Sequence, residues 1–95
     1  MASTKDYLLY VLDLLREVSG ISFKKMMGEY ILYKDGIIFG GVYDNRFLVK
    51  KTKSLENGDL IEQIPYPDAK SMYLIESEDS VEIKDIIYTI YNDLK

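Results

Sequence analysis

The segment YKDGIIFGGVYDNRFLVK, residues 33–50, holds two turn signals close together, and they indicate how the central strands are connected. Asp35-Gly36 and Asp44-Asn45 are pairs of residues that tolerate the left-handed backbone of a two-residue hairpin turn. Apolar and aromatic residues flank both pairs, as is typical of strands. The segment therefore predicts the centre of a three-stranded antiparallel meander, rather than a ligand-binding loop.

The register of this meander assigns its side chains to two faces. With Tyr33 opposite Ile38 and Val42 opposite Phe47, one face is wholly apolar and is expected to pack beneath helices. That face carries Ile31, Tyr33, Ile38, Gly40, Val42, Phe47 and Val49. The other face is mixed, but it keeps more large apolar side chains than a solvent face usually does. Its candidate interface residues, for a second copy of the chain or another protein, are Tyr30, Leu32, Ile37, Phe39, Tyr43 and Leu48.

Helical periodicity is found near both ends of the chain. Apolar residues recur at helical spacing from about Thr4 to Val18, and Gly20 suits a position that ends a helix. Asp79 or Ser80 is expected to cap a last helix. The apolar stripe of that helix consists of Ile83, Ile86, Ile87, Ile90 and Leu94.

The segments between these helices and the meander complete the predicted order. Residues 21–34 predict one extended strand with a bulge at Gly28. Residues 54–64 predict a short helix or helical turn, and residues 65–77 predict a loose hairpin. The order is α-β-β-β-α-β-β-α, which indicates a single α+β domain over residues 1–95, with an antiparallel sheet and helices mainly on one face.

The composition excludes several kinds of site. The chain has no histidine and no cysteine, so His-based triads, thiol nucleophiles, disulfides and zinc sites of the usual Cys/His type are impossible. Glycine-rich phosphate loops and EF-hand motifs are missing from the sequence. We therefore expect no enzyme, no cofactor and no metal. The absence of a membrane-length apolar run, a signal-peptide pattern and cysteine fits a cytoplasmic protein.

The charges are unevenly distributed along the chain. The net charge of −4 disfavours general affinity for nucleic acid. Residues 24–53 nevertheless carry seven basic residues against three acidic ones. If two strand ends meet, a basic patch for phosphate or an acidic partner would form from Lys24, Lys25, Lys50, Lys51 and Lys53. The alternative is that these lysines only protect strand edges and keep the chain soluble.

Several of these features together resemble a known family of bacterial regulators. The features are Lys25-Met26-Met27-Gly28, then Tyr30, Tyr33, Asp35-Gly36, Phe39 and Lys50. This pattern is similar to the N-terminal domain of the TfoX/Sxy competence-regulator family, which has Phe where this chain has Met27. The resemblance spans almost the whole chain. It implies a stand-alone copy of that domain, an α+β fold shared with secretion chaperones, and a role in regulating competence genes.

Three functions remain open from the sequence. The first is a non-enzymatic regulatory or protein-interaction domain of the TfoX N-terminal type, whose partner is another protein or a second copy of the chain. The second is a nucleic-acid-associated regulator that uses the basic patch. The third is a small-molecule binder, or a small enzyme that works without His or Cys.

Overall fold

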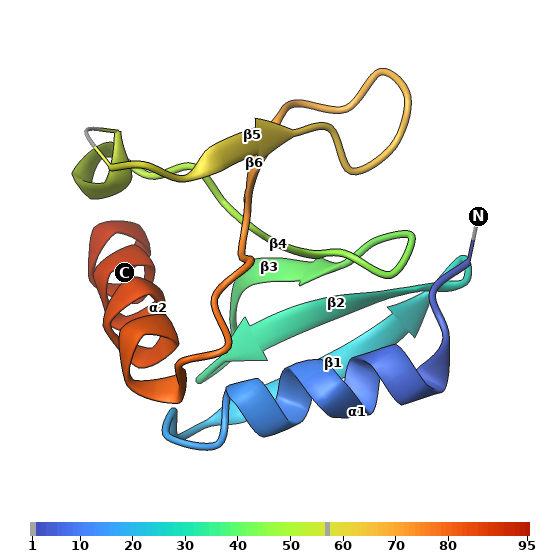
Figure 1. Ribbon diagram of the computed structural model, residues 1–95, viewed down its shortest axis with the longest axis horizontal. Helices are drawn as coiled ribbons and strands as arrows, with labels where there is room; N and C mark the ends of the chain where they lie inside the picture. The colour runs from blue at the N-terminus through green and yellow to red at the C-terminus, as the bar shows by residue number, and fades with distance from the viewer. Residues whose placement is uncertain (1, 57) are drawn as a thin grey trace.

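The computed structural model describes residues 2–56 and 58–95 and has the α+β architecture expected from the sequence (Figure 1). Every pair of neighbouring strands is antiparallel, and the order across the sheet is β1-β2-β3-β4-β6-β5. The elements in chain order are α1 (Lys5–Leu14), β1 (Ile21–Met26), β2 (Glu29–Lys34), β3 (Ile37–Val42), β4 (Phe47–Val49), the 3-10 turn η1 (Lys53–Leu55), β5 (Ile61–Gln63), β6 (Met72–Leu74) and α2 (Ser80–Leu94).

The two turns of the central meander are confirmed. Asp35-Gly36 has φ angles of +48° and +83°, and Asp44-Asn45 has +52° and +54°, so both pairs adopt the left-handed backbone. The strands β2, β3 and β4 pair in sequence through these turns. The two predicted partner pairs are present, Tyr33 with Ile38 and Val42 with Phe47.

A bulge between these two pairs overturns part of the predicted face assignment. Tyr33 pairs with Ile38 but Leu32 pairs with Gly40, so Phe39 has no partner in β2. An extra residue in one strand shifts the register by one, which moves the following side chains to the opposite face. Leu32 and Phe39 are consequently fully buried, whereas Ile38 is 38% exposed.

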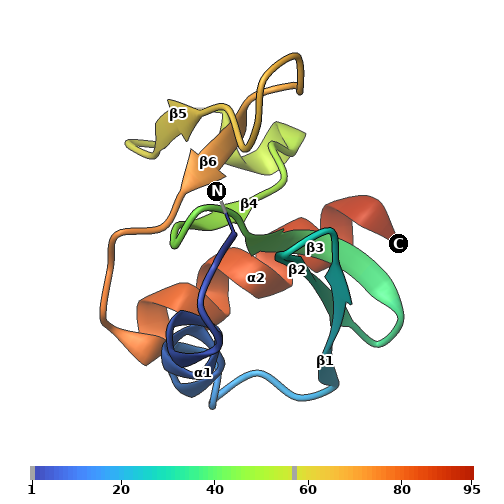
Figure 2. The ribbon, with the colours of Figure 1, turned by 90° about the vertical axis from the view of Figure 1, so that its right-hand side faces the viewer.

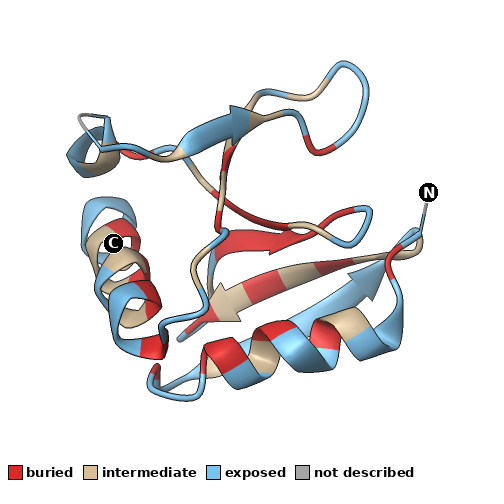
Figure 3. Cartoon of the chain, in the orientation of Figure 1, coloured by how far each residue is buried: buried red, intermediate tan, exposed pale blue. Residues whose placement is uncertain are grey.

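Both helices lie on the same side of strands β2 to β4 (Figures 1 and 2). Each helix turns a buried apolar stripe toward the sheet and exposes its other side (Figure 3). The core that they share with the sheet consists mainly of Leu8, Val11, Leu14, Leu15, Tyr30, Leu32, Phe39, Val42, Phe47, Val49, Ile83, Ile87 and Ile90. Helices on one face of an antiparallel sheet are therefore confirmed.

The helix α2 begins at the predicted cap. Asp79 is the N-cap, and its carboxylate accepts hydrogen bonds from the amides of Val81 and Glu82 at 2.9 and 3.4 Å. These bonds satisfy amides that have no partner within the first turn. Among residues 2–56 and 58–95, neither helix is long and apolar enough to cross a membrane.

Three segments differ from the predicted elements. Residues 65–77 hold the single strand β6, which pairs with the preceding strand β5, instead of forming a hairpin of their own. Residues 21–34 form the two strands β1 and β2, joined by a tight turn at Met27-Gly28 with φ angles of +52° and +84°, instead of one bulged strand. Residues 54–64 contain the end of η1 and then β5, instead of a helix. Gly58 and Asp59 are poor helix formers, which explains why the helical turn is short. The observed order is α-β-β-β-β-η-β-β-α.

Lys34 is a buried cation that connects the β2–β3 hairpin to both helical regions. Its side chain is almost completely buried, and its Nζ donates to the carbonyl of Ser19 at 2.8 Å and to the carboxylate of Asp35 at 3.2 Å. The same Nζ lies 4.6 and 5.1 Å from the ring centroids of Tyr88 and Tyr91 on α2. A buried ammonium is stable only with such partners.

Glu29 ties the N-terminal segment to the β3–β4 turn. Its Oε1 accepts hydrogen bonds from the amide and the hydroxyl of Ser3 at 2.9 and 2.6 Å, and its carboxylate also accepts from the amide of Asp44. The side-chain oxygen of Asn45 accepts from the amide of Thr4 at 2.9 Å. The residues before α1 are thus held against the turn between β3 and β4.

Candidate functional site

The five lysines of the predicted basic patch lie in two separate groups. Lys24 and Lys25 are on the edge strand β1, whereas Lys50 and Lys51 follow β4 and Lys53 begins η1. Strands β2 and β3 lie between these two groups in the sheet. Three strand spacings separate β1 from β4 by roughly 14 Å. The expectation that both groups meet at one end of the sheet is wrong.

The six residues of the predicted interface do not form an uncovered apolar face. Five of them are buried within the chain, and Ile37 is half-buried. Those that join the core shared with the helices are Tyr30, Leu32 and Phe39. The bulge at Phe39 is the physical reason, because it directs this side chain and those of β2 toward the helices. An interface built on these six residues would require the core to open.

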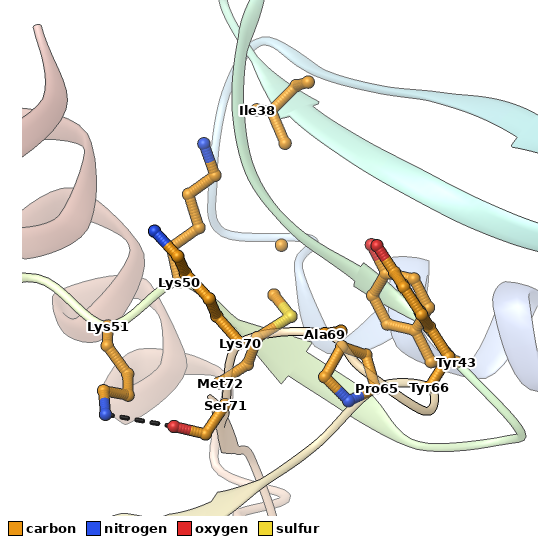
Figure 4. A pocket seen from close by; sticks show the side chains of 11 residues that line it. Ile38, Tyr43, Lys50, Lys51, Pro65, Tyr66, Ala69, Lys70, Ser71 and Met72 are labelled. Atoms are coloured by element: carbon orange, nitrogen blue, oxygen red, sulfur yellow. Dashed lines mark hydrogen bonds between the residues drawn. The ribbon is translucent and has the colours of Figure 1, made fainter.

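An open pocket of about 740 Å³ lies on the side of the sheet that the helices do not cover (Figure 4). It lies between the sheet and the loop at residues 64–71, which joins β5 to β6. None of its lining side chains belongs to the core formed with the helices. We call it the lysine–tyrosine pocket after its charged and aromatic lining, which consists of Lys50, Lys51, Lys70, Tyr43 and Tyr66.

The two tyrosines form one wall of this pocket. The ring centroids of Tyr43 and Tyr66 are 6.1 Å apart and the rings are inclined by 52°, a geometry that aromatic pairs favour. Tyr43 is mostly buried, while Tyr66 is 58% exposed. Burial raises the pKa of Tyr43, with smaller contributions from Tyr66 and Glu29. Its phenol is therefore neutral at physiological pH and presents a hydroxyl donor beside an apolar ring.

The lysines line the opposite side of the pocket (Figure 4). Lys51 already forms an ion pair within the chain, since its Nζ lies 2.7 Å from Glu62 Oε1 and 3.0 Å from Ser71 Oγ. The hydrogen bond to Glu62 raises the pKa of Lys51. Among residues 2–56 and 58–95, no carboxylate lies within ion-pairing distance of Lys50 or Lys70. These two ammonium groups are available to an anionic ligand.

Arg46 positions the loop that supplies Tyr66 and Lys70. Its guanidinium donates to the carbonyls of Tyr43, Ile64 and Pro65 at 3.1 to 3.2 Å. A further bond of 2.9 Å reaches the side-chain oxygen of Gln63. One side chain thus joins the β3–β4 turn to the start of the loop. It holds the loop side of the pocket opposite the sheet side.

Sequence reasoning included Tyr43, Lys50 and Lys51 among its candidates but missed Tyr66 and Lys70. Their approach to the sheet depends on the path of a loop, which hydrophobic periodicity does not reveal. The segment PYPDAK at residues 65–70 carried one usable signal, because a tyrosine between two prolines is held in an exposed, stiff backbone.

Comparison with known proteins identifies a bacterial relative of the chain. No family model matches it. A protein of Spirochaeta aurantia, described as an uncharacterized 12.7 kDa protein in the trpE 5' region, is 30% identical over 93 residues. The match covers 92% of this chain and 79% of the relative. The chain belongs to the family of this spirochaete protein.

Proposed function

We propose that the protein is a non-enzymatic regulatory domain of the TfoX N-terminal type that binds a protein partner at the lysine–tyrosine pocket. The pocket carries this proposal, because it gathers two unengaged lysines and two tyrosines outside the core. Tyrosine and methionine are enriched at protein interfaces, and tyrosine supplies a large, rigid contact area at low cost in side-chain entropy. Both occur here, with Met72 on the pocket wall.

The regulatory part of the proposal rests on the resemblance to TfoX. Of the residues that carry the resemblance, Asp35-Gly36 forms the central hairpin turn and Lys50 lines the pocket. The motif that resembles the TfoX family ends at Lys50, a residue of the pocket. This supports the proposal that this chain and the family recognise partners in the same way.

Photo-crosslinking in the host cell tests the proposal. The residue p-benzoylphenylalanine would replace Tyr66 in the pocket and, as a control, Tyr10 on α1, which is also exposed and aromatic. We expect a covalent adduct of protein mass from position 66 but not from position 10. An adduct of equal yield from both positions, or none from position 66, would contradict a protein partner at the pocket.

A small-molecule binder is the second candidate because of the size of the pocket. A volume of about 740 Å³ falls within the ~300–1,000 Å³ that ligand sites usually occupy. In that case crosslinking at position 66 would yield no protein adduct. A small metabolite bound to the purified protein would then appear in native mass spectrometry and be lost in a Tyr66→Ala variant.

A further inference from the structure

The charge of the lysine–tyrosine pocket is opposite to that of the whole protein. Its eleven lining residues include three lysines and no aspartate or glutamate, although the chain has a net charge of −4. Lys51 is already neutralised by Glu62, which leaves Lys50 and Lys70 as the recognition groups. A local positive site on an acidic protein attracts anionic groups and repels cationic ones, and the acidic surroundings keep the attraction local.

The remaining lining of the pocket is apolar and partly exposed. Ile38 is 38% exposed and Tyr66 is 58% exposed, while Met72 is half-buried. Covering this surface with an apolar group of a ligand removes it from water, which contributes favourably to the free energy of binding. The best occupant therefore has carboxylates or phosphates next to an apolar or aromatic group.

A second hollow restricts how far an anionic ligand can extend. Tyr66 and Pro65 also line this neighbouring hollow. Its charged side chains are Glu29, Asp44 and Arg46, and the guanidinium of Arg46 is already bound to loop carbonyls. A nucleic-acid strand that stacked on Tyr66 and continued past it would bring its phosphates toward these carboxylates. A short peptide can confine its acidic groups to the lysine side of the pocket. The charges thus favour a peptide over a nucleic acid.

We infer that the lysine–tyrosine pocket binds an acidic peptide segment that contains an aromatic or large apolar residue. The carboxylates of the segment bind Lys50 and Lys70, and its apolar side chain packs between Tyr66 and Ile38. The inference rests on the proposed function and specifies the chemistry of the partner. The complex is expected to weaken with salt, because its ion pairs are exposed to solvent.

Fluorescence anisotropy with a labelled peptide of sequence Glu-Asp-Phe-Asp-Glu tests the inference. The pocket variant is the double substitution Lys50→Gln and Lys70→Gln, and the control is Lys24→Gln with Lys25→Gln on β1. Both variants change the net charge equally, and all four lysines lie outside the core. We expect the pocket variant to lose roughly fivefold to twentyfold in affinity and the control less than about twofold. Equal losses in the two variants would overturn the inference.

Altered probes separate the two components of the ligand. The peptide Gln-Asn-Phe-Asn-Gln should bind more weakly because it lacks carboxylates, and Glu-Asp-Ser-Asp-Glu because it lacks the aromatic ring. Tyr66→Ala should weaken binding of the parent peptide, whereas Tyr10→Ala on α1 should not. A neutral peptide that binds as tightly as the acidic one would contradict the inference. So would an oligothymidylate that binds the pocket more tightly than the acidic peptide.

Chemical-shift mapping provides a readout that needs no variant. Titration with Glu-Asp-Phe-Asp-Glu should shift the amides around Lys50, Tyr66 and Lys70 and leave those of Lys24 and Lys25 unchanged. No shift at the pocket, together with a persistent protein adduct from position 66, would reject the acidic peptide and retain the proposed function. The loss of both signals would reject both.

Discussion

Phe39 and Ile38 are neighbours in sequence with opposite environments, and together they test the bulge in β3. Phe39 is completely buried, while Ile38 is 38% exposed. Phe39→Ala should lower the free energy of unfolding by about 3–5 kcal/mol because it leaves a cavity in the core. Ile38→Ala should cost about 1 kcal/mol or less. Urea denaturation of both variants measures these free energies of unfolding. A larger decrease for Ile38→Ala than for Phe39→Ala would show that the bulge is misplaced.

Lys34 offers a second test at the scale of the residue, because its ammonium is buried among specific partners. Lys34→Ala removes the bond to the Ser19 carbonyl and the contacts with Tyr88 and Tyr91. We expect a loss of about 1–3 kcal/mol in the free energy of unfolding. Lys34→Met keeps the aliphatic stem and should lose less. If Ala and Met destabilise the protein equally, the loss comes from the ammonium contacts and not from the packing of the stem. A Met variant as stable as the parent would show that the ammonium contacts contribute nothing.

At the scale of the element, the loop between β5 and β6 depends on Arg46. Its guanidinium holds the carbonyls of Ile64 and Pro65, and a lysine cannot reproduce this planar set of donors. Arg46→Lys should therefore leave the loop less ordered and speed amide hydrogen exchange at residues 66–71 by roughly tenfold. Amides of β2, which Arg46 does not contact, serve as the internal control. Unchanged exchange in the loop would show that the loop is held by other contacts.

The elements that the sequence predicted best are those with local signals. Both hairpin turns of the meander are marked by Asp, Asn and Gly, whose tolerance of the left-handed backbone can be recognised from the local sequence alone. The bulge at Phe39 has no such mark, because it depends on how β2 and β3 together present side chains to the helices. The pocket was only partly predictable for the same reason, since Tyr66 and Lys70 approach the sheet through the tertiary contacts of Arg46.

At the scale of the whole molecule, two exposed carboxylates connect segments that are distant in sequence. Glu62 on β5 binds Lys51, and its pKa lies below the ordinary 4.5 because of the hydrogen bonds from Lys51 and Ser71. Asp93 on α2 accepts hydrogen bonds from the hydroxyl and the amide of Ser54, and those bonds lower its pKa below 3.8.

Both depressed pKa values make the fold less stable in acid. A carboxyl group with a lowered folded pKa stabilises the protein above its unfolded pKa, and this stabilisation is lost as pH falls through the folded value. The urea midpoint should therefore decrease as the pH falls from about 5 to about 3. The double variant Glu62→Gln with Asp93→Asn should show a weaker dependence on pH over this window. An identical pH dependence in parent and variant would show that other carboxylates determine acid stability.

The attachment of the N-terminal segment affects how the protein can be labelled or fused. Ser3 and Thr4 are bound to Glu29 and Asn45, so added sequence at this end emerges beside the β3–β4 turn, where Arg46 begins its bonds to the pocket loop. The C-terminal end of α2 lies at the opposite side of the molecule (Figure 1). An affinity tag or fluorescent fusion at the N-terminus is therefore expected to obstruct partners of the loop, whereas the same fusion at the C-terminus leaves that approach open.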